Sequence, residues 1–322
     1  MPDIVYDLVR EAVAQHARVT PLLPAVDLSE RLGRDVWVKA ECLQPTGSFK
    51  VRGAAARLVA LDAEERSVGV VACSSGNHGR AVAYVAERMG IPASVYVPDW
   101  VDPVKLEGIR ATGAEAVLAG ATFDEAEAAA IEQASQSGRL YISAYDDPRV
   151  IVGQGTMALE VLEQLECAPA AFVVPLSGGG LAGGMAAALE KQLGSAAPQC
   201  VAVSAEKAAV MSTSVRAGHP VDLPEEDTLA SALAGGIGLE NEYSFALVRD
   251  LIEHHMSVTE AEIAAAMNYC VQHLNLVVEG GGAVGVAACL GEDWPPTEFP
   301  EGPIVIVLSG GNVATDTLLS VL

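Results

Sequence analysis

The sequence predicts an α/β fold in which parallel sheets are covered by helices on both faces. Short runs of β-branched residues alternate with Ala-rich amphipathic stretches along nearly the whole chain. Several of these stretches have a helix-start residue before them and a Gly after them. Because parallel strands need long crossover connections, this alternation is typical of sheets with helices on both faces.

The apolar periodicity places the elements in order along the chain. Strands are predicted at 36–40, 69–74, 93–98, 114–120, 171–177, 199–206 and 303–311. Helices are predicted at 79–90, 103–113, 122–138, 153–165 and 259–274. The chain has no repeat, low-complexity tract or linker, so a second domain must be inserted into the first.

The grouping of the strands predicts where that insertion lies. The strands between about 70 and 120 form one βαβα group, and residues 144–156 lead back to another sheet. We therefore predict a small domain at 54–144, inserted into a large domain formed by 1–53 and 145–322. The active site is expected between the two domains.

Charge and composition argue against several kinds of partner. Acidic residues number 42 against 19 basic ones in 322 residues, which gives a net charge of −23. A surface of that sign repels nucleic acid and anionic membranes, so neither is predicted as a partner. The N-terminal segment carries acids among its apolar residues and has no cleavage site, which favours a cytoplasmic protein. The six scattered cysteines form no Cys-x-x-Cys pair and are expected as buried apolar residues of a reducing compartment.

Three glycine-rich turns, at 74–81, 177–184 and 309–315, each follow a predicted strand and open a helix. Ligands of open parallel sheets bind beyond the carboxyl ends of the strands, so these turns are three candidate walls of one site. The middle turn is a strong anion site, because its glycines let backbone N–H groups approach a phosphate at a helix start. The residues expected to bind the phosphate are Gly178, Gly179, Gly180 and Leu181.

The same turn also allows two other interpretations. It is compatible with a tight turn that packs a helix on a strand. It also satisfies G-x-G-x-x-G through Gly178, Gly180 and Gly183, and Glu206 ends the next strand roughly 20 residues on, which is the dinucleotide fingerprint. A nicotinamide enzyme therefore remains an alternative, although it leaves Lys50 and the other two turns unexplained.

One of the five lysines, Lys50, lies in "QPTGSFKVRGA" between an aromatic ring and a turn. A solvated lysine and a nucleophilic lysine both fit this context by itself. A nucleophilic lysine together with a phosphate site suggests pyridoxal phosphate, whose aldehyde reacts with an amine. An amide such as that of Asn77 can bond its phenolic oxygen, and a hydroxyl such as that of Ser309 can meet its ring nitrogen.

The motifs "QPTGSFKVRGA", "SSGNHGRAVAY", "VPLSGGGLAGG", "VVEGGGAVG" and "VLSGGN" resemble, in order and spacing, the serine/threonine dehydratase and serine racemase family. The resemblance covers nearly the whole chain. It implies the tryptophan synthase β-like fold type II of pyridoxal-phosphate enzymes, with two three-layer αβα domains. The stretches "VSAEKAAVM" and "LAGGIGLENEYSFALVRDLI" look most like the hydroxyectoine-utilization dehydratases, a branch of this family.

The resemblance implies a role for each matching residue. Lys50 matches the lysine that holds the cofactor, and Phe49 matches the aromatic residue beside the cofactor ring. Asn77 matches the asparagine at the phenolic oxygen, and Ser309 matches the partner of the ring nitrogen. The match to the phosphate loop covers Gly178, Gly179, Gly180 and Leu181.

The turn at 74–81 is expected to bind the substrate. Ser75 resembles the serine that faces the cofactor opposite Lys50 in serine racemases, although a helix cap is an equal reading. The substrate carboxylate is expected on backbone N–H groups from Ser75 through Gly76 and Asn77 to His78, with the His78 ring in a structural role.

Two acidic residues carry further expectations. Glu279 either lies near the cofactor ring or is a carboxylate at the edge of the core. Some relatives hold a divalent cation with a carboxylate pair after the sixth strand. Glu206 matches the first carboxylate, but Ser212 stands at the second position, so no metal ligand is predicted and a divalent cation stays open.

We predict a pyridoxal-phosphate-dependent lyase that eliminates water from a β-hydroxy amino acid. The substrate is expected to be of the threonine or serine type, or a hydroxyectoine-derived compound, and the products a 2-oxo acid and ammonia. The alternatives are an amino-acid racemase of the same family, a nicotinamide oxidoreductase and a catalytically silent binding protein. We further expect a cytoplasmic homodimer with Lys50 and Ser75 as its catalytic residues.

Overall fold

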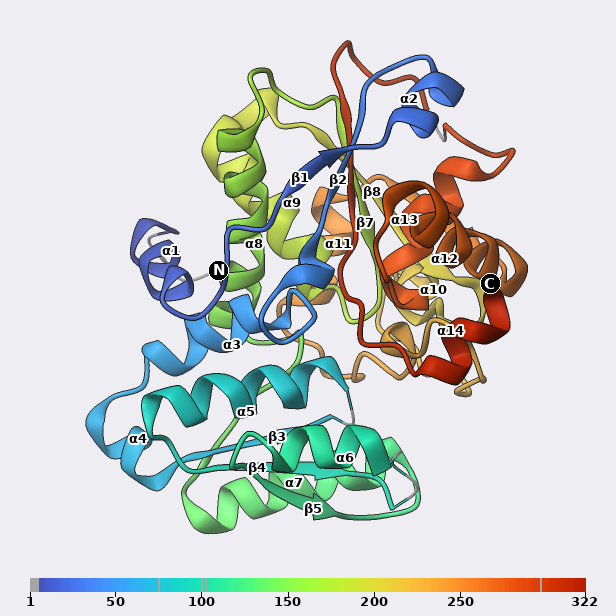
Figure 1. The fold of residues 1–322 in the computed structure, drawn as a ribbon. Coiled ribbons are helices and arrows are strands. Elements are labelled where there is room, and N and C mark those ends of the chain that lie inside the picture. The colour runs from blue at the N-terminus through green and yellow to red at the C-terminus, as the bar shows by residue number, and fades with distance from the viewer. Residues whose placement is uncertain (1–5, 75, 100, 102, 296) are drawn as a thin grey trace.

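The chain builds two separate sheets, which Figure 1 shows in two parts of the molecule. This computed structural model describes residues 6–74, 76–99, 101, 103–295 and 297–322. In spatial order the larger sheet contains β1 (Leu22–Pro24), β2 (Val36–Lys39), β10 (Ile304–Val307), β7 (Ala171–Pro175), β8 (Gln199–Ala205) and β9 (His254–Val258). The smaller sheet contains β5 (Glu115–Leu118), β4 (Ala93–Val97), β3 (Val70–Cys73) and β6 (Leu140–Tyr141). All neighbouring strands are parallel except β1 and β2.

Helices connect the strands and cover both sheets (Figure 1). In the first half of the chain they are α1 (Tyr6–Ala14), α2 (Val26–Leu32), α3 (Lys50–Val59), α4 (Ala63–Val68), α5 (Asn77–Met89), α6 (Pro103–Arg110), α7 (Phe123–Ser137) and α8 (Pro148–Gln164). In the second half they are α9 (Gly180–Leu193), α10 (Val210–Ala217), α11 (Ser244–Leu251), α12 (Glu260–Leu274), α13 (Gly280–Leu290) and α14 (Thr315–Val321).

Strand β10 shows why the larger sheet is covered on both faces. Its four residues are all apolar and fully buried, and successive side chains of a strand point to opposite faces. Ile304 and Ile306 belong to the core cluster that includes α12 and α13. Val305 and Val307 belong to the cluster that includes α8 and α9. A parallel strand with two apolar faces needs helices on both sides, as the sequence predicts.

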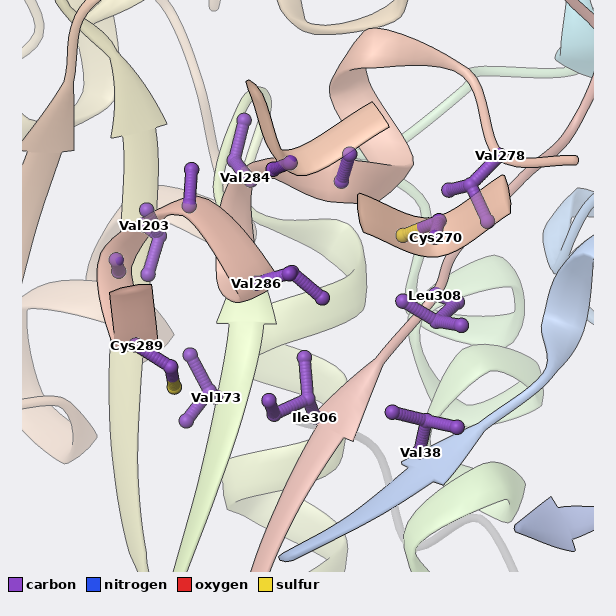
Figure 2. Packing of buried hydrophobic residues seen from close by; sticks show 14 of the residues in the cluster. Val38, Val173, Val203, Cys270, Val278, Val284, Val286, Cys289, Ile306 and Leu308 are labelled. Carbon is purple, nitrogen blue, oxygen red and sulfur yellow. The ribbon is translucent and has the colours of Figure 1, made fainter. Parts of the chain in front are cut away.

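Figure 2 shows the first of these clusters from close by. Val173 of β7 and Ile306 of β10 lie against Val286 and Cys289 of α13. Burying a side chain of this size stabilises the fold by about 1.5–3 kcal/mol, so this face of the sheet is a main source of stability. It holds the carboxyl ends of the central strands in fixed positions.

The smaller sheet is also covered on both faces. Val70 and Ala72 of β3 pack in one cluster with α5, whereas Val71 and Cys73 pack in another with α7. The predicted βαβα group is therefore confirmed in its strands and helices. The boundaries of the two predicted domains, 54–144 and the remainder, stay predictions.

The predicted elements agree with the structure, with a few differences. All seven predicted strands are present within one to two residues at most ends, although β10 ends earlier, at Val307. Helix α8 begins at Pro148, five residues before the predicted start, because the Asp147 side chain accepts hydrogen bonds from Arg149 N (2.8 Å) and Val150 N (3.1 Å). The strands β1, β6 and β9 are additional to the prediction, and β1 makes the sheet mixed.

Two further expectations concern the cysteines and membranes. All six cysteines are free, and Cys73, Cys200, Cys270 and Cys289 are buried as expected, whereas Cys167 is exposed. Within the described part of the chain, no helix has the length and apolar character that a membrane crossing requires.

Candidate active site

Lys50 is the first residue of α3, and its side chain reaches the segment between β6 and α8. Its Nζ donates a hydrogen bond to the Ala144 carbonyl (2.8 Å) and lies 5.2 Å from the centre of the Phe49 ring. Burial lowers the pKa of Lys50 to about 8, although Glu279 opposes this shift. A half-buried amine with a lowered pKa is the state expected of a nucleophilic lysine.

Lys39 is also buried, but its hydrogen bonds distinguish it from Lys50. Burial lowers the pKa of Lys39 too, against the attraction of Glu160, so the direction of the shift alone does not separate the two lysines. The Lys39 ammonium donates to Glu160, to the Thr20 carbonyl (2.8 Å) and to Gln164 Oε1 (2.7 Å). These three bonds use all three N–H groups, so Lys39 is a structural lysine.

A buried ion cluster fixes the start of α3. Two residues after Lys50, Arg52 donates to both Glu41 oxygens (2.8 Å each) and to Glu160 Oε2 (2.9 Å). With Lys39, the cluster holds two positive and two negative side chains that are almost completely buried. Burial raises the pKa of Glu41, but the Arg52 guanidinium lowers it more, so Glu41 remains ionised. The cluster therefore ties α3 to the segment after β2 and to α8.

The turn at 74–81 meets the turn at 309–315 beside Lys50. The amide of Asn77, the first residue of α5, donates from Nδ2 to Glu279 Oε1 (2.5 Å). Its Oδ1 accepts a hydrogen bond from Asn312 Nδ2 (2.6 Å). Two of the three predicted walls are thus in direct contact. Glu279, one of the two acidic residues singled out in the sequence, bonds Asn77 here, and Asn312 is a residue that the sequence reasoning did not assign to the site.

Ser309 lies just after β10 and is held against the Lys50 turn. Its side chain is 5% exposed, and its carbonyl accepts a hydrogen bond from Phe49 N (3.0 Å). Ser48 and Gly310 form an isolated antiparallel bridge at the same place. The structure therefore brings Ser309, Phe49 and Lys50 together, although 259 residues separate Ser309 from Lys50 in the sequence.

The predicted phosphate loop lies between β7 and α9. Gly179 has φ 82°, a left-handed conformation that favours glycine. A Cβ on Gly178 would come within 2.3 Å of the Tyr145 ring, and one on Gly180 within 2.8 Å of the Tyr145 backbone. These two glycines are therefore required by the close approach of Tyr145. Leu181 is buried in the core, where it anchors the first turn of α9.

The segment 142–146 connects these parts. Its carbonyls at Ile142 and Ala144 bond the His78 ring (2.9 Å) and the Lys50 amine (2.8 Å). The next residue, Tyr145, covers the phosphate loop. The Asp146 carboxylate then accepts three backbone N–H groups at the start of α11, at 2.7–2.8 Å. One short segment thus contacts His78, Lys50 and the predicted phosphate loop.

Three further residues of the turn at 74–81 are predicted to belong to the site: His78, Gly76 and Ser75. His78 is buried, and its hydrogen bond to the Ile142 carbonyl supports the structural role expected of its ring. Burial and the nearby Lys50 lower the pKa of His78 to about 3, so the ring is neutral. Gly76 is the N-cap residue of α5. Ser75 lies outside the described residues.

The two positions compared with the carboxylate pair of cation-binding relatives are Glu206 and Ser212. Ser212 is buried and shares a hydrogen bond with Ser204 (3.1 Å), and Glu206 is exposed. No group of three His, Cys, Asp or Glu side chains is arranged to hold a metal ion within the ranges that the structure describes.

Comparison with known proteins identifies the family of the chain. The family described as "Pyridoxal-phosphate dependent enzyme" matches residues 13–310. An L-threonine ammonia-lyase of Geobacter sulfurreducens is 38% identical over 318 residues, which cover 97% of this chain and 77% of that protein. A serine racemase of Arabidopsis thaliana is 38% identical over 303 residues, 93% of this chain and 89% of that protein.

The fold comparison agrees with the sequence comparison. The solved structure of maize serine racemase superposes with a TM-score of 0.91 at 32% identity, covering 98% of this chain and 94% of that chain. The chain belongs to the family of pyridoxal-phosphate-dependent enzymes, in its serine/threonine dehydratase and serine racemase group. It is a lyase with pyridoxal phosphate as its cofactor, which decides against the nicotinamide alternative.

Proposed function

We propose that this lyase eliminates water from a β-hydroxy-α-amino acid of the threonine or serine type, giving a 2-oxo acid and ammonia. The observation that supports this most strongly is the half-buried Lys50 amine, with its pKa lowered to about 8 and its position over the Phe49 ring. The similarity to an L-threonine ammonia-lyase supports elimination as the reaction.

The residues around Lys50 fit the chemical groups of pyridoxal phosphate. The Lys50 amine suits the aldehyde, and the Asn77 amide offers an N–H to the phenolic oxygen. Ser309 offers a neutral hydroxyl to the ring nitrogen, and the first turn of α9 offers backbone N–H groups to the phosphate. When bound, the cofactor supplies an electron sink for the charge left on the α-carbon.

The side chains and backbone of this chain then carry the reaction. Backbone N–H groups of Asn77 and His78, in the first turn of α5, bind the substrate carboxylate. Lys50 Nζ takes the proton from the α-carbon, and the Ala144 carbonyl holds the amine in place. Loss of the α-proton and the β-hydroxyl, together one water, leaves an enamine. The enamine becomes an imine and hydrolyses to the 2-oxo acid and ammonia.

Ammonia release by the purified protein tests the proposed reaction. Threonine, serine, hydroxyaspartate and hydroxyectoine-derived compounds form the substrate set, because they differ in the group beside the β-hydroxyl. We expect absorbance at about 410–420 nm from bound cofactor and ammonia from at least one of these compounds. A protein with that absorbance that releases ammonia from none of them is a silent binding protein.

Racemisation is the second candidate function, and the similarity to serine racemases supports it. It requires a proton donor on the face of the substrate opposite Lys50, and Ser75 is the residue we propose for it. Deuterium exchange at the α-carbon of L- and D-substrates measures this directly. Exchange with the L-substrate alone contradicts racemisation and leaves elimination in place.

The rate of cofactor uptake by the cofactor-free protein should rise with pH through about 8. Only the unprotonated amine attacks the aldehyde, and an ordinary lysine with a pKa of 10.5 is mostly protonated at this pH. The folded state binds fewer protons than the unfolded state between about 8 and 10.5, so the free energy of unfolding should also rise over this interval. The appearance of the visible band at a series of pH values measures the midpoint. A midpoint near 10.5 contradicts the lowered pKa.

Replacing Ser309 should slow turnover without unfolding the protein. In Ser309→Ala the ring nitrogen loses a partner, which costs on the order of 1–3 kcal/mol. Ser309→Asp should protonate the ring and increase transamination relative to elimination. Ser257→Ala, in the exposed part of β9, is the control for the substitution itself. Identical product ratios in Ser309→Ala and Ser309→Asp would show that Ser309 does not touch the ring.

We also propose that the protein works as a homodimer in the cytoplasm. The dimer is expected from the family resemblance, and the compartment from the six cysteines, all of which are free. Sedimentation of the active protein tests the dimer, because a fully active monomer contradicts it.

A further inference from the structure

A chain of hydrogen bonds runs from the molecular surface to Asn77. Arg80 of α5 is exposed, and its Nη1 donates to Asn312 Oδ1 (2.8 Å). Asn312 Nδ2 donates to Asn77 Oδ1 (2.6 Å) and to the Thr46 carbonyl (2.9 Å). Asn77 Nδ2 then donates to Glu279 Oε1 (2.5 Å). These hydrogen bonds join residues of the predicted small domain to three segments of the predicted large domain.

The groups that bond Asn312 fix the donor-to-acceptor direction of this series of hydrogen bonds. A guanidinium only donates hydrogen bonds, so Asn312 must turn its Oδ1 toward Arg80. The Thr46 carbonyl only accepts, which independently places Asn312 Nδ2 on the opposite side. The Asn77 amide next to this NH2 group must therefore accept with its Oδ1. Its Nδ2 is left to face Glu279, whose Oε1 accepts the hydrogen bond.

The backbone leaves room for this arrangement at two glycines. A Cβ on Gly47 would come within 2.3 Å of Asn312 Oδ1. A Cβ on Gly310 would come within 2.1 Å of Glu279 Oε1 and 3.2 Å of Asn77 Nδ2. The "TGS" and "SGG" turns therefore accommodate the two side chains on either side of Asn77. The two turns leave space for these side chains, and the hydrogen-bond partners of Asn312 decide which way its amide faces.

We propose that Asn312 is a positioning residue that sets the orientation of the Asn77 amide, with Arg80 as its support. This inference rests on the proposed role of Asn77 at the phenolic oxygen of the cofactor. That oxygen, when ionised, only accepts hydrogen bonds, so only the NH2 side of the amide is productive. One N–H of Asn77 Nδ2 goes to Glu279, and the other remains for the cofactor. With the amide reversed, two oxygens would face each other.

Asn312→Asp is the most direct test, because it keeps the shape and removes the N–H donors. The aspartate still accepts from Arg80, but it cannot donate to Asn77 Oδ1, so the Asn77 amide loses its orientation. We expect the affinity for the cofactor to fall about tenfold to a hundredfold, the effect of losing one hydrogen bond to a charged group. The pH at which the visible band of bound cofactor changes should also rise, since its ionised oxygen loses a donor.

Arg80 variants provide a graded series with a matched control. Arg80→Ala should show the same spectral shift but a smaller one, because the Thr46 carbonyl still holds Asn312. Arg80→Lys keeps a donor and should restore most of the wild-type behaviour. The control is Arg88→Ala, on the same helix, where the guanidinium lies over the Tyr84 ring, and it should match the wild type.

The outcomes separate this inference from the proposed function. If Asn312→Asp and Arg80→Ala bind the cofactor with wild-type affinity, band position and pH titration, the positioning role is wrong while the function stands. A lowered melting temperature with an unchanged spectrum also overturns it, because that is the result of a merely structural role. If the wild-type protein itself forms no visible band with pyridoxal phosphate, the proposed function fails and this inference fails with it.

Discussion

Lys50→Ala should lose both the visible absorbance of bound cofactor and all measurable elimination. The substitution removes the amine that attacks the aldehyde and also takes the α-proton, and acid–base groups alone typically contribute roughly 10²–10⁴-fold to rate. The measurements are the absorbance of the purified variant and its ammonia release. Since Lys50 donates only to a backbone carbonyl among the bonds seen, the fold should tolerate the change.

Two controls make this result specific. Lys207→Ala removes a surface lysine whose Nζ bonds the Asp227 carbonyl (2.9 Å), and it should behave as the wild type. Lys50→Arg keeps a positive charge but no reactive amine, and it should be as inactive as the alanine variant. Retained absorbance together with retained turnover in Lys50→Ala contradicts the whole account of the site.

Arg52→Ala should destabilise the protein by about 3–5 kcal/mol, the cost of removing one partner from a buried ion cluster. The change removes two hydrogen bonds from Glu41 (2.8 Å each) and two from Glu160 (2.9 and 3.1 Å), in an interior where their charges are poorly solvated. Urea unfolding of the cofactor-free protein measures the free energy of unfolding in both proteins.

Arg10→Ala is the matched control for this prediction. Arg10 and Glu163 form an exposed pair at 2.5 Å, with side chains 33% and 59% exposed, and such surface pairs contribute about 0–1 kcal/mol. The two variants differ in burial rather than in the type of pair. Equal losses of stability in both variants contradict the energetic role given to the buried cluster.

Much of the fold could be predicted because its strands are long and apolar enough to show their period. A run such as that of β10, with both faces buried, is visible without any other information. Strand β6 has two residues and β1 has three, which is too short for a pattern to appear. Strand β9 lies at the edge of the sheet and begins with two histidines, so its apolar signal is weak.

Part of the site could likewise be predicted from sequence motifs, whereas the rest depends on tertiary contacts. Lys50, Asn77 and Ser309 are predictable because their chemistry belongs to their side chains and their turns have recognisable sequences. The contribution of Ala144 is a carbonyl, which any residue can supply, so no sequence signal indicates it. Asn312 is visible in "VLSGGN", but its role depends on a contact with a residue 235 positions away.

The buried ion cluster shows another limit of sequence reasoning. In the sequence, Lys39 occupies the polar position of an alternating strand, and such a position is normally expected to face solvent. Its partner Glu160 lies 121 residues further on, in a helix whose periodicity also allows an exposed acid at that position. Only the packing of α8 on α3 reveals that the two charges are buried together.

Borohydride reduction followed by peptide mapping tests the central claim most directly. Reduction fixes the cofactor on the amine that holds it, and the labelled peptide then identifies that lysine. We predict that the label is found on Lys50, within the peptide containing "TGSFK". A label on Lys39, Lys105 or another lysine, or no label in a protein that shows the visible band, contradicts the account.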